Sequence, residues 1–379
     1  MKKLLWVGDA ACDTGFARVS HAVLETLMKH WKIVVLGINY KGNPHSYPYP
    51  IYPCYPGGDQ FGVGRVKEIA ERENVDLIVI QNDVWNISPY LKELNCKFPV
   101  VGVLPVDGKN CKGVLINQLQ LGIFWTQFGL CEAKSGGFTS AGTVIPLGVN
   151  LNTFKKLDKK ICRKNVLPSR FTNGRSPQDA FIIGNVNRNQ PRKRLDLTIS
   201  FFAEWIKKYD NKDAYLLLHV APTGDPCFDL RQLATYYGIA DRIILSGFDK
   251  SYETYALAQL YNIFDIGLTT TQGEGWGLTT MEGMACGVPH VVPEWSALAE
   301  WAKDATEQVP CSEIAVTLNR INAIGAVPDR DKMIVSIQAL YESKQRREEL
   351  SDRGLALVSE PRYSWADIGE KFITSLEAV

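Results

Sequence analysis

Short apolar runs alternate with segments of helical periodicity along the whole chain, and this alternation restricts the fold more than any other feature. Residues 16–30 and 65–75, for example, carry apolar side chains at helical spacing between such runs. Near-continuous apolar strands separated by helices are typical of parallel sheets that are covered on both faces. The sequence therefore predicts an α/β fold with two such sheets. The expected strands are residues 2–8, 31–39, 75–81, 98–106, 122–127 and 142–149 in the first half, and residues 181–186, 214–220, 242–248, 263–270 and 289–293 in the second.

The length of 379 residues suits two domains better than one core. Residues 151–178 are polar, basic and broken by proline and glycine, which predicts a linker between the two sheets. We interpret its basic residues as a solvated face, with contact to nucleic acid as the alternative. These residues are Lys155, Lys156, Lys159, Lys160, Arg163, Lys164, Arg170 and Arg175.

Two further segments have a distinct pattern. Residues 41–64 are rich in proline, tyrosine and glycine, and we expect them to form a long irregular loop. Residues 363–378 have the pattern of an amphipathic final helix, for which Ser364 is the expected N-cap.

Composition indicates a globular protein of the cytoplasm. Hydrophobic residues make up 45% of the chain and charged residues 22%, and the formal net charge of +1 provides no global field for gathering polyanions. Nine cysteines occur without a C-x-x-C pair, so we expect free thiols in a reducing compartment and no metal site. The first apolar run ends at Asp9, too short for a secretory signal, and no run reaches the ~18–20 residues of a membrane span.

Ligands of doubly wound domains bind beyond the carboxyl ends of the strands, and two loops at such points are candidates. In the first, Thr14, Gly15 and Phe16 open a helix, but the loop lacks the G-x-G-x-x-G spacing of a dinucleotide site. In the second, Arg188 and Lys193 stand five positions apart before a helix. Two cations at a helix N-terminus oppose the helix dipole unless an anion lies between them, so this loop predicts a phosphate or diphosphate site. A solvated basic turn is the alternative, and the neighbouring Arg192 and Arg194 would in that case simply face water.

The third candidate is TTTQGEGWGLTTMEGMACGVPHVVP, residues 269–293. It contains Glu274 and Glu282, eight positions apart, and five glycines at 273, 275, 277, 283 and 287. Thr279 and Glu282 match a capping box, which would explain one glutamate as a helix cap. That interpretation leaves Glu274 and the glycine-rich loop unexplained, because glycine makes a loop costly to order. Exposed backbone N–H groups suit an anion and the carboxylates suit hydroxyls, so the stretch favours a nucleotide sugar as ligand.

These motifs together resemble those of the retaining GT-B glycosyltransferases, in particular glycosyltransferase family 4 (glycosyl transferases group 1). The interval from Glu274 to Glu282 matches the family's E-x7-E signature, and EGWGLTTMEGMACGVPHV resembles EGFGL…EAMACGxPVV. VNRNQPRK is similar to the GR-x4-K motif that binds the donor phosphates, and VIPLGVNLNTF to VIPNGVD…F. YSWADIGEKF resembles the family's final helix, which crosses back to the first domain.

The resemblance implies a GT-B architecture of two Rossmann-like domains that face a cleft. The expected acceptor-binding domain is residues 1–172, completed by residues 362–379, and the expected donor-binding domain is residues 173–361. The implied reaction is transfer of a hexose, with retention and without metal, from a UDP- or GDP-linked sugar to a hydroxyl acceptor. No cofactor is implied beyond this donor substrate.

The resemblance also implies roles for particular residues. Arg188 and Lys193 would neutralise the diphosphate, Glu274 would hold the transferred sugar, and Glu282 would accept the ribose hydroxyls. Asp107 stands where many relatives carry a histidine, and we assign it to the sugar or the acceptor, with an Asx turn before Gly108 as the alternative. Arg194 replaces a glycine that commonly follows the donor lysine. The implied catalytic residues are Arg188, Lys193, Glu274 and Asp107, and the implied donor-binding residues are Gly15, Phe16, Arg188, Lys193, Gly247, Phe248, Glu274, Gly275, Trp276, Gly277, Leu278 and Glu282.

Several alternatives stay open at this stage. A nucleotide-sugar 2-epimerase shares the architecture but would need acid–base residues around the sugar, and a non-catalytic nucleotide-binding protein would not need both glutamates and both cations. The acceptor is a glycan, a small molecule or a hydroxylated base in viral DNA. Binding to DNA would draw on the local basic residues and weaken steeply with salt.

Overall fold

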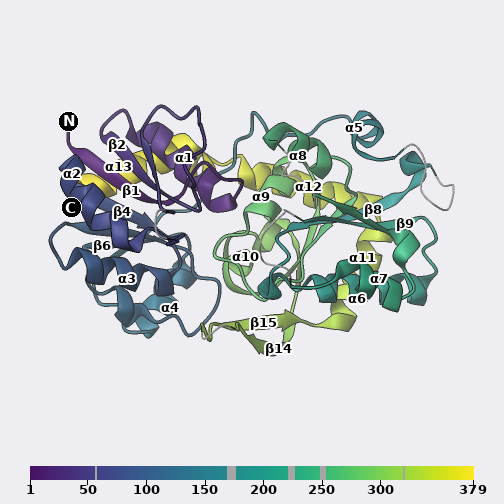
Figure 1. Ribbon diagram of the computed structural model, residues 1–379. Coiled ribbons are helices and arrows are strands. Elements are labelled where there is room, and N and C mark those ends of the chain that lie inside the picture. The colour runs from purple at the N-terminus through teal and green to yellow at the C-terminus, as the bar shows by residue number, and fades with distance from the viewer. Residues whose placement is uncertain (56–57, 169–175, 221–226, 248–252, 319–320) are drawn as a thin grey trace. The chain divides into compact units, whose positions relative to one another are not determined.

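The computed structural model describes residues 1–379 except 56–57, 169–175, 221–226, 248–252 and 319–320 (Figure 1). The chain forms two compact units, one of Met1–Gly148 with Pro361–Val379 and one of Val149–Glu360. Each unit is built on its own parallel sheet with helices on both faces, so the predicted α/β class is confirmed.

The sheet of the first unit is parallel throughout, with the strand order β3-β2-β1-β4-β5-β6-β7. Its strands are β1 (Lys3–Asp9), β2 (Lys32–Ile38), β3 (Ile51–Pro53), β4 (Leu77–Gln81), β5 (Val100–Leu104), β6 (Leu121–Phe124) and β7 (Ala141–Val144). The order reverses at β1, because β1 pairs with β2 on one side and with β4 on the other. The carboxyl end of β1, where the Thr14-Gly15-Phe16 loop follows, therefore lies at a topological switch point, the usual ligand position of such sheets.

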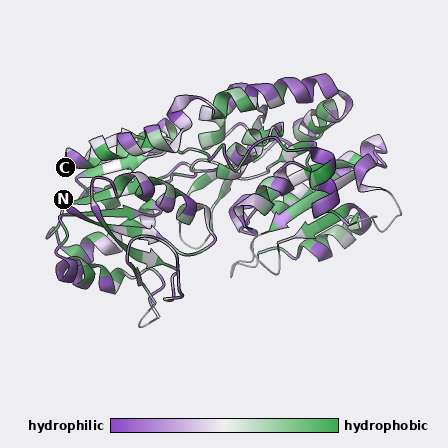
Figure 2. Ribbon diagram, turned by 90° about the horizontal axis from the view of Figure 1, so that it is seen from above, coloured by the Kyte–Doolittle hydropathy of each residue, from purple (hydrophilic) through white to green (hydrophobic). Residues whose placement is uncertain are grey.

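Helices cover both faces of this sheet. Leu5 and Val7 of β1 belong to a core that α2 (Val66–Glu73), α3 (Val84–Leu94) and α4 (Gln127–Ser135) complete. The intervening Trp6 points to the opposite face, which α1 (Gly15–Leu27) and α13 (Trp365–Glu377) cover. Figure 2 shows the same division, with hydrophobic residues along the strands and hydrophilic residues on the outer sides of the helices.

The C-terminal helix α13 belongs to the first unit, as the final helix was predicted to do. Ser364 is its N-cap and accepts a hydrogen bond from the backbone N–H of Asp367 at 3.1 Å. The helix crosses α1 closely, since a Cβ atom on Gly369 would lie 2.5 Å from the side chain of Thr26.

The sheet of the second unit is also parallel, with the order β10-β9-β8-β11-β12-β13. Its strands are β8 (Phe181–Asn187), β9 (Ala214–Val220), β10 (Ile243–Ser246), β11 (Ile266–Leu268), β12 (His290–Pro293) and β13 (Glu307–Val309). One face packs against α6 (Leu195–Tyr209), α7 (Leu230–Tyr236) and α11 (Arg330–Glu342). The unit also contains α5 (Lys159–Val166), α8 (Thr254–Tyr261), α9 (Leu278–Ala285), α10 (Ser296–Trp301) and α12 (Lys344–Val358).

Four strands were not predicted, and each is short or outside the parallel pattern. β3 lies within the segment expected to be an irregular loop, where its three residues extend the edge of the first sheet next to β2. β13, also three residues long, extends the second sheet beside β12. An antiparallel hairpin of β14 (Cys311–Val316) and β15 (Ile324–Pro328) follows β13.

The predicted linker is partly a folded element of the second unit. Residues 159–166 form α5, and Arg163 is only 5% exposed. Its guanidinium donates to the Ile263 carbonyl at 3.2 and 3.3 Å and to Asp265 Oδ2 at 2.7 Å. Lys159 also reaches Asp265, at 2.9 Å. The interpretation of these residues as a solvated face is therefore wrong for Arg163, while Arg170 and Arg175 lie outside the described residues.

Candidate active site

The loop from β8 to α6 carries the predicted cations. Arg188 follows the last residue of β8 and is exposed. Pro191–Lys193 then form a single 3-10 turn, in which the Lys193 N–H donates to the Gln190 carbonyl at 3.0 Å. Arg194 closes the turn in the left-handed region, at φ 48°, and α6 begins at the next residue. The turn directs the Lys193 side chain inward, where 12% of it is exposed.

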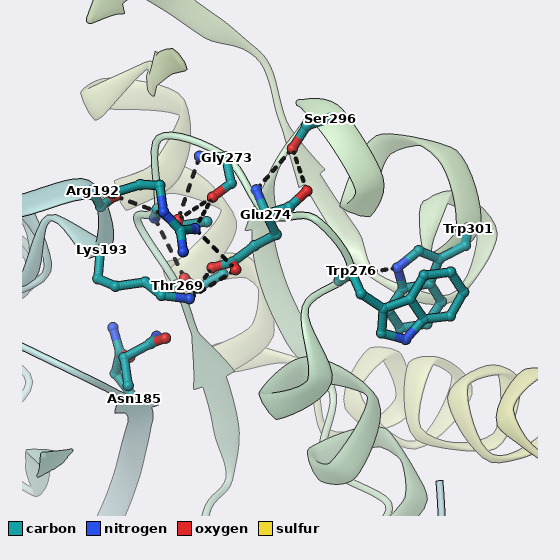
Figure 3. A network of polar contacts seen from close by, with 11 residues as sticks. Asn185, Arg192, Lys193, Thr269, Gly273, Glu274, Trp276, Ser296 and Trp301 are labelled. Atoms are coloured by element: carbon teal, nitrogen blue, oxygen red, sulfur yellow. Dashed lines mark hydrogen bonds and ion pairs between the residues drawn. The ribbon is translucent and has the colours of Figure 1, made fainter. Parts of the chain in front are cut away.

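Glu274 forms an ion pair with Lys193. Its carboxylate lies 2.6 and 2.7 Å from Lys193 Nζ through its two oxygens (Figure 3). The Arg192 guanidinium is a second cation on the same group, 3.2 Å from Glu274 Oε2, and it also donates to the Gly273 carbonyl. Arg192 therefore does not simply face water, because its side chain is 20% exposed and joins the site.

These two cations decide the charge of Glu274. The residue is 7% exposed, and burial by itself would raise the pKa of its carboxyl. Lys193 and Arg192 outweigh burial and lower this pKa to about 2. The site therefore holds an ionised, buried carboxylate at neutral pH.

The backbone around Glu274 is held on both sides. Ser296, at the start of α10, accepts a hydrogen bond from the Glu274 N–H at 2.9 Å and donates its hydroxyl to the Glu274 carbonyl at 3.1 Å. Two residues earlier, the Gln272 N–H donates to the Arg192 carbonyl at 2.9 Å. The Gln272 carbonyl accepts from the Ala326 N–H of β15, also at 2.9 Å. The unpredicted hairpin thus supports the loop that carries Glu274.

A buried chain of polar side chains joins the two loops beneath this pair. Asn185 Nδ2 donates to Thr198 Oγ1 at 3.0 Å, and Thr198 Oγ1 lies 2.6 Å from Thr270 Oγ1. Thr270 in turn donates to the Arg194 carbonyl at 2.7 Å. Such a network of buried hydrogen bonds fixes the relative position of the strand ends. At the other end of this network, Asn187 Nδ2 donates to Asn185 Oδ1. The Oδ1 atom of Asn187 itself is buried without a partner among the residues that the structure describes.

Glu282 is buried on α9, with 3% of it exposed. It accepts a hydrogen bond from the Tyr261 hydroxyl of α8 at 2.9 Å. The N-cap of α9 is Gly277, whose φ is 93°, and no side chain caps the helix, so Thr279 lies within the first turn. The capping-box interpretation of Glu282 is therefore wrong, because the helix begins too early for Thr279 to be its cap.

Three of the five glycines have roles in packing and backbone conformation. Gly277 and Gly287 have φ values of 93° and 76°, in the left-handed region that favours glycine. A Cβ atom on Gly283 would lie 2.3 Å from the His290 ring, so α9 rests directly on this buried imidazole of β12. Burial lowers the pKa of His290 to about 4, and the ring is neutral at physiological pH.

Trp276 and Gly247 have buried surroundings. The Trp276 ring stacks on Trp301 at 5.0 Å between centroids (Figure 3). The Trp276 indole N–H donates to Met281 Sδ at 3.4 Å. The Trp276 carbonyl accepts a hydrogen bond from the Trp301 indole N–H at 2.7 Å, and the residue lies beside the buried Gly275 and the half-buried Leu278. Gly247 follows β10 at φ 82° with His219 packed against it, whereas the predicted Phe248 lies outside the described residues.

The first unit carries the remaining predicted residues. Gly15 begins α1 behind its N-cap Thr14, whose hydroxyl donates to Asp9 Oδ2 at 2.6 Å. The Phe16 carbonyl accepts a hydrogen bond from Gln81 Nε2 at 3.1 Å, which ties the first helical turn to β4. Asp107 is half-buried, three residues beyond β5. All three therefore follow strands at the carboxyl edge of the first sheet.

Sequence reasoning missed three residues of this site. Arg192 was recognised only as additional charge, Ser296 lies outside the motifs, and Tyr261 was given no role. Tyr261 was recognisable only as part of a helix, and Ser296 adopts φ 50°, which no local pattern predicts. Among the described residues, no three His, Cys, Asp or Glu side chains are grouped to hold a metal ion. In the same part of the chain, no helix has both the length and the apolarity to cross a bilayer.

Two doubly wound parallel-sheet domains, with the last helix returned to the first, define the GT-B class of fold. The model of the family Glycosyl transferases group 1 matches residues 169–352, which contain Arg188, Lys193 and both glutamates. The chain is similar to D-inositol 3-phosphate glycosyltransferase 2 of Catenulispora acidiphila, with 27% identity over 62% of this chain and 52% of that protein. It thus spans about half the length of this curated relative.

Solved structures share the whole architecture. Sucrose-phosphate synthase from Thermosynechococcus elongatus is similar with a TM-score of 0.76 and 15% identity, over 100% of this chain and 99% of that chain. HepE of Anabaena, in complex with UDP and glucose, is similar with a TM-score of 0.72 and 18% identity over 100% of both chains. At these identities the likeness establishes the fold.

Proposed function

We propose that this protein is a retaining glycosyltransferase that moves a hexose from a UDP- or GDP-linked sugar to a hydroxyl acceptor. The observation that carries the proposal is the buried, ionised Glu274 held by Lys193 at the carboxyl edge of the second sheet. A carboxylate of this kind accepts hydrogen bonds from sugar hydroxyls, and the adjacent cations suit a diphosphate. The family match over residues 169–352 supports the same assignment.

Each group has a role in the proposed reaction. Lys193 and Arg188 neutralise the diphosphate and stabilise the charge that develops on it as the glycosidic bond breaks. Glu274 orients the transferred sugar, and Glu282 accepts the ribose hydroxyls. The roles of the Gly15 backbone N–H toward phosphate and of Asp107 toward the sugar or the acceptor rest on the family resemblance and stay predictions. Because side-chain cations carry the diphosphate charge, the reaction proceeds without a metal ion.

The donor and acceptor follow in outline from the relatives. HepE was solved with UDP and glucose, which supports a uridine donor, while a guanosine donor is the alternative. The name of the Catenulispora relative gives its acceptor as an inositol phosphate, and a hydroxyl group on a small polar molecule is the corresponding acceptor class here.

The first experiment identifies the donor and then removes Glu282. A thermal-shift panel of UDP- and GDP-sugars selects the best binder, and hydrolysis and transfer from it are measured in EDTA. We expect turnover in EDTA, and a product whose anomeric configuration by proton NMR matches the donor's. We expect Glu282→Ala to lose at least a hundredfold in donor hydrolysis, since it removes the proposed hydrogen-bond acceptor of the ribose hydroxyls, a loss of about 3 kcal/mol.

Glu348→Ala is the matched control, because Glu348 lies exposed on α12 in the same unit. It should retain full activity. Unaltered hydrolysis by Glu282→Ala would show that the donor is bound elsewhere.

A further inference from the structure

Lys193 serves two anions in the proposed reaction, and the structure shows how firmly one of them holds it. Its ammonium contacts both oxygens of Glu274, within 2.7 Å. The proposed function also assigns this ammonium to the donor diphosphate. A phosphate drawn to Lys193 therefore approaches a buried carboxylate of the same sign and competes with it for the same cation.

Arg192 resolves this competition. We propose that Arg192 is a positioning residue that keeps Glu274 ionised and in place while Lys193 turns toward the diphosphate. The inference rests on the proposed function and deepens it. A diphosphate diester and Glu274 together carry three negative charges, and Arg188, Lys193 and Arg192 supply three positive ones.

The contacts of Arg192 are those expected of a cation that remains paired with Glu274 when the donor binds. Its carbonyl accepts hydrogen bonds from the Gln272 N–H at 2.9 Å and the Thr271 hydroxyl at 3.4 Å. Its guanidinium donates both to the Gly273 carbonyl and to Glu274. Arg192 is thus bound at backbone and side chain to the segment 271–274, so it moves with Glu274 as one piece.

Lys193 is held by its ammonium group, which donates to both oxygens of Glu274 (Figure 3). An ammonium on a flexible four-carbon stem reorients readily, whereas a planar guanidinium with two fixed acceptors does not. The difference between the two side chains is the physical basis of the division of roles.

Without Arg192, binding of the donor should be coupled to the uptake of a proton by Glu274. A buried carboxylate without a cation favours its neutral form. In Arg192→Gln, a diphosphate that draws Lys193 away leaves Glu274 unpaired, so Glu274 takes up a proton on binding. Affinity for the nucleotide sugar should then fall by about tenfold or more at pH 8 and recover as the pH is lowered to 5.

Isothermal titration calorimetry tests this directly. UDP-glucose and GDP-mannose are the probes, because a diphosphate diester does not itself titrate between pH 5 and 8. Titrations in buffers of different ionisation enthalpy count the protons taken up. We expect none for the wild type, close to one for Arg192→Gln at pH 6, and wild-type behaviour restored by Arg192→Lys.

Arg194→Gln is the matched control. Arg194 is 23% exposed, against 20% for Arg192, and its guanidinium is paired with Asp196 at 2.9 Å. The control removes the same charge two residues along and should bind without proton uptake.

The outcomes separate the two proposals. Equal affinity and equal proton uptake in the wild type and Arg192→Gln overturn the role of Arg192 and leave the proposed function intact. Proton uptake by the wild type overturns it as well, and that measurement holds even if Arg192→Gln does not fold. A wild-type protein that binds no member of the panel of UDP- and GDP-sugars overturns the proposed function itself.

Discussion

The charge of Glu274 is a property of three side chains rather than of one. Burial opposes ionisation, and Lys193 and Arg192 more than offset it. Loss of either cation would leave the buried carboxylate less compensated and would destabilise the fold. The buried ion pair is therefore also a pH-dependent element of the fold.

This linkage predicts how Glu274 affects stability with pH. The pKa of its carboxyl falls from 4.5 to about 2 on folding, so the folded state favours the ionised form. The stabilisation is fully present above about pH 4.5 and is lost as the pH falls toward 2. We expect Glu274→Gln to be less stable than the wild type at pH 7 by on the order of 3 kcal/mol, with a difference that shrinks below pH 4.5.

Urea denaturation of both proteins between pH 7 and 3 measures this difference. Glu348→Gln on α12 removes a carboxylate of the same kind outside the site and serves as control. A difference between wild type and Glu274→Gln that stays constant down to pH 3 would contradict the ion-pair origin.

At the residue scale, spacing predicted the chemistry but not the partners. Lys193 and Glu274 were both identified as site residues, because each falls after a strand and in a recognisable motif. Their direct contact was not predicted, since the two residues lie 81 positions apart and meet only through the parallel order of β8 and β11. Ser296 was unpredictable for the same reason, because its contact with Glu274 depends on how β12 returns to the site.

At the scale of the elements, two glycines within helices differ in whether packing requires them. Gly369 lies in α13 where a Cβ atom would come within 2.5 Å of Thr26 on α1. Gly354 lies in α12, and its Cβ atom would meet Met284 at an ordinary contact distance of 3.4 Å. The first glycine permits a close helix crossing, and the second is only a poor helix former.

The two positions should respond to alanine with opposite signs. Gly354→Ala should stabilise the protein by about 0.5–1 kcal/mol, because alanine restricts the unfolded chain and favours the helix. Gly369→Ala should destabilise it by about 1–2 kcal/mol, because α13 must shift away from α1. Thermal unfolding of the two variants beside the wild type measures both effects, and equal shifts would refute the close crossing of α1 and α13.

Long apolar elements were predictable and short edge elements were not. β1 and β9 are seven-residue strands whose side chains are almost all buried, so their composition alone identifies them. β3 includes Pro53 and only three residues, and proline at a sheet edge is compatible with either a strand or a loop. The β14–β15 hairpin carries exposed apolar residues and lies outside the repeating strand–helix pattern.

At the scale of the whole molecule, composition excluded more than it identified. We expected the first domain to end at residue 172, whereas the first unit gives way to the second after Gly148. The two boundaries differ because α5 packs with the second unit through Arg163 and Asp265. A basic, proline-broken segment resembles a linker in sequence. The segment belongs to the second unit because Arg163 pairs with Asp265, which is distant in the sequence.

The ion pairs of Asp265 with Arg163 and Lys159 also argue against DNA as a ligand of this protein. The net charge of +1 provides no general attraction to polyanions, and Arg163 and Lys159 of the basic segment are already paired with Asp265. We therefore expect no specific retention of duplex DNA with hydroxymethylated bases, measured by fluorescence anisotropy at 50 and 200 mM salt. A protein that neutralises six or more phosphates loses about a thousandfold in affinity over that range, so a steep decline from tight binding at 50 mM would contradict the expectation. Transfer to a small hydroxyl acceptor, assayed at the same two salt concentrations, should change by less than about tenfold, because only the donor's diphosphate charge is then screened.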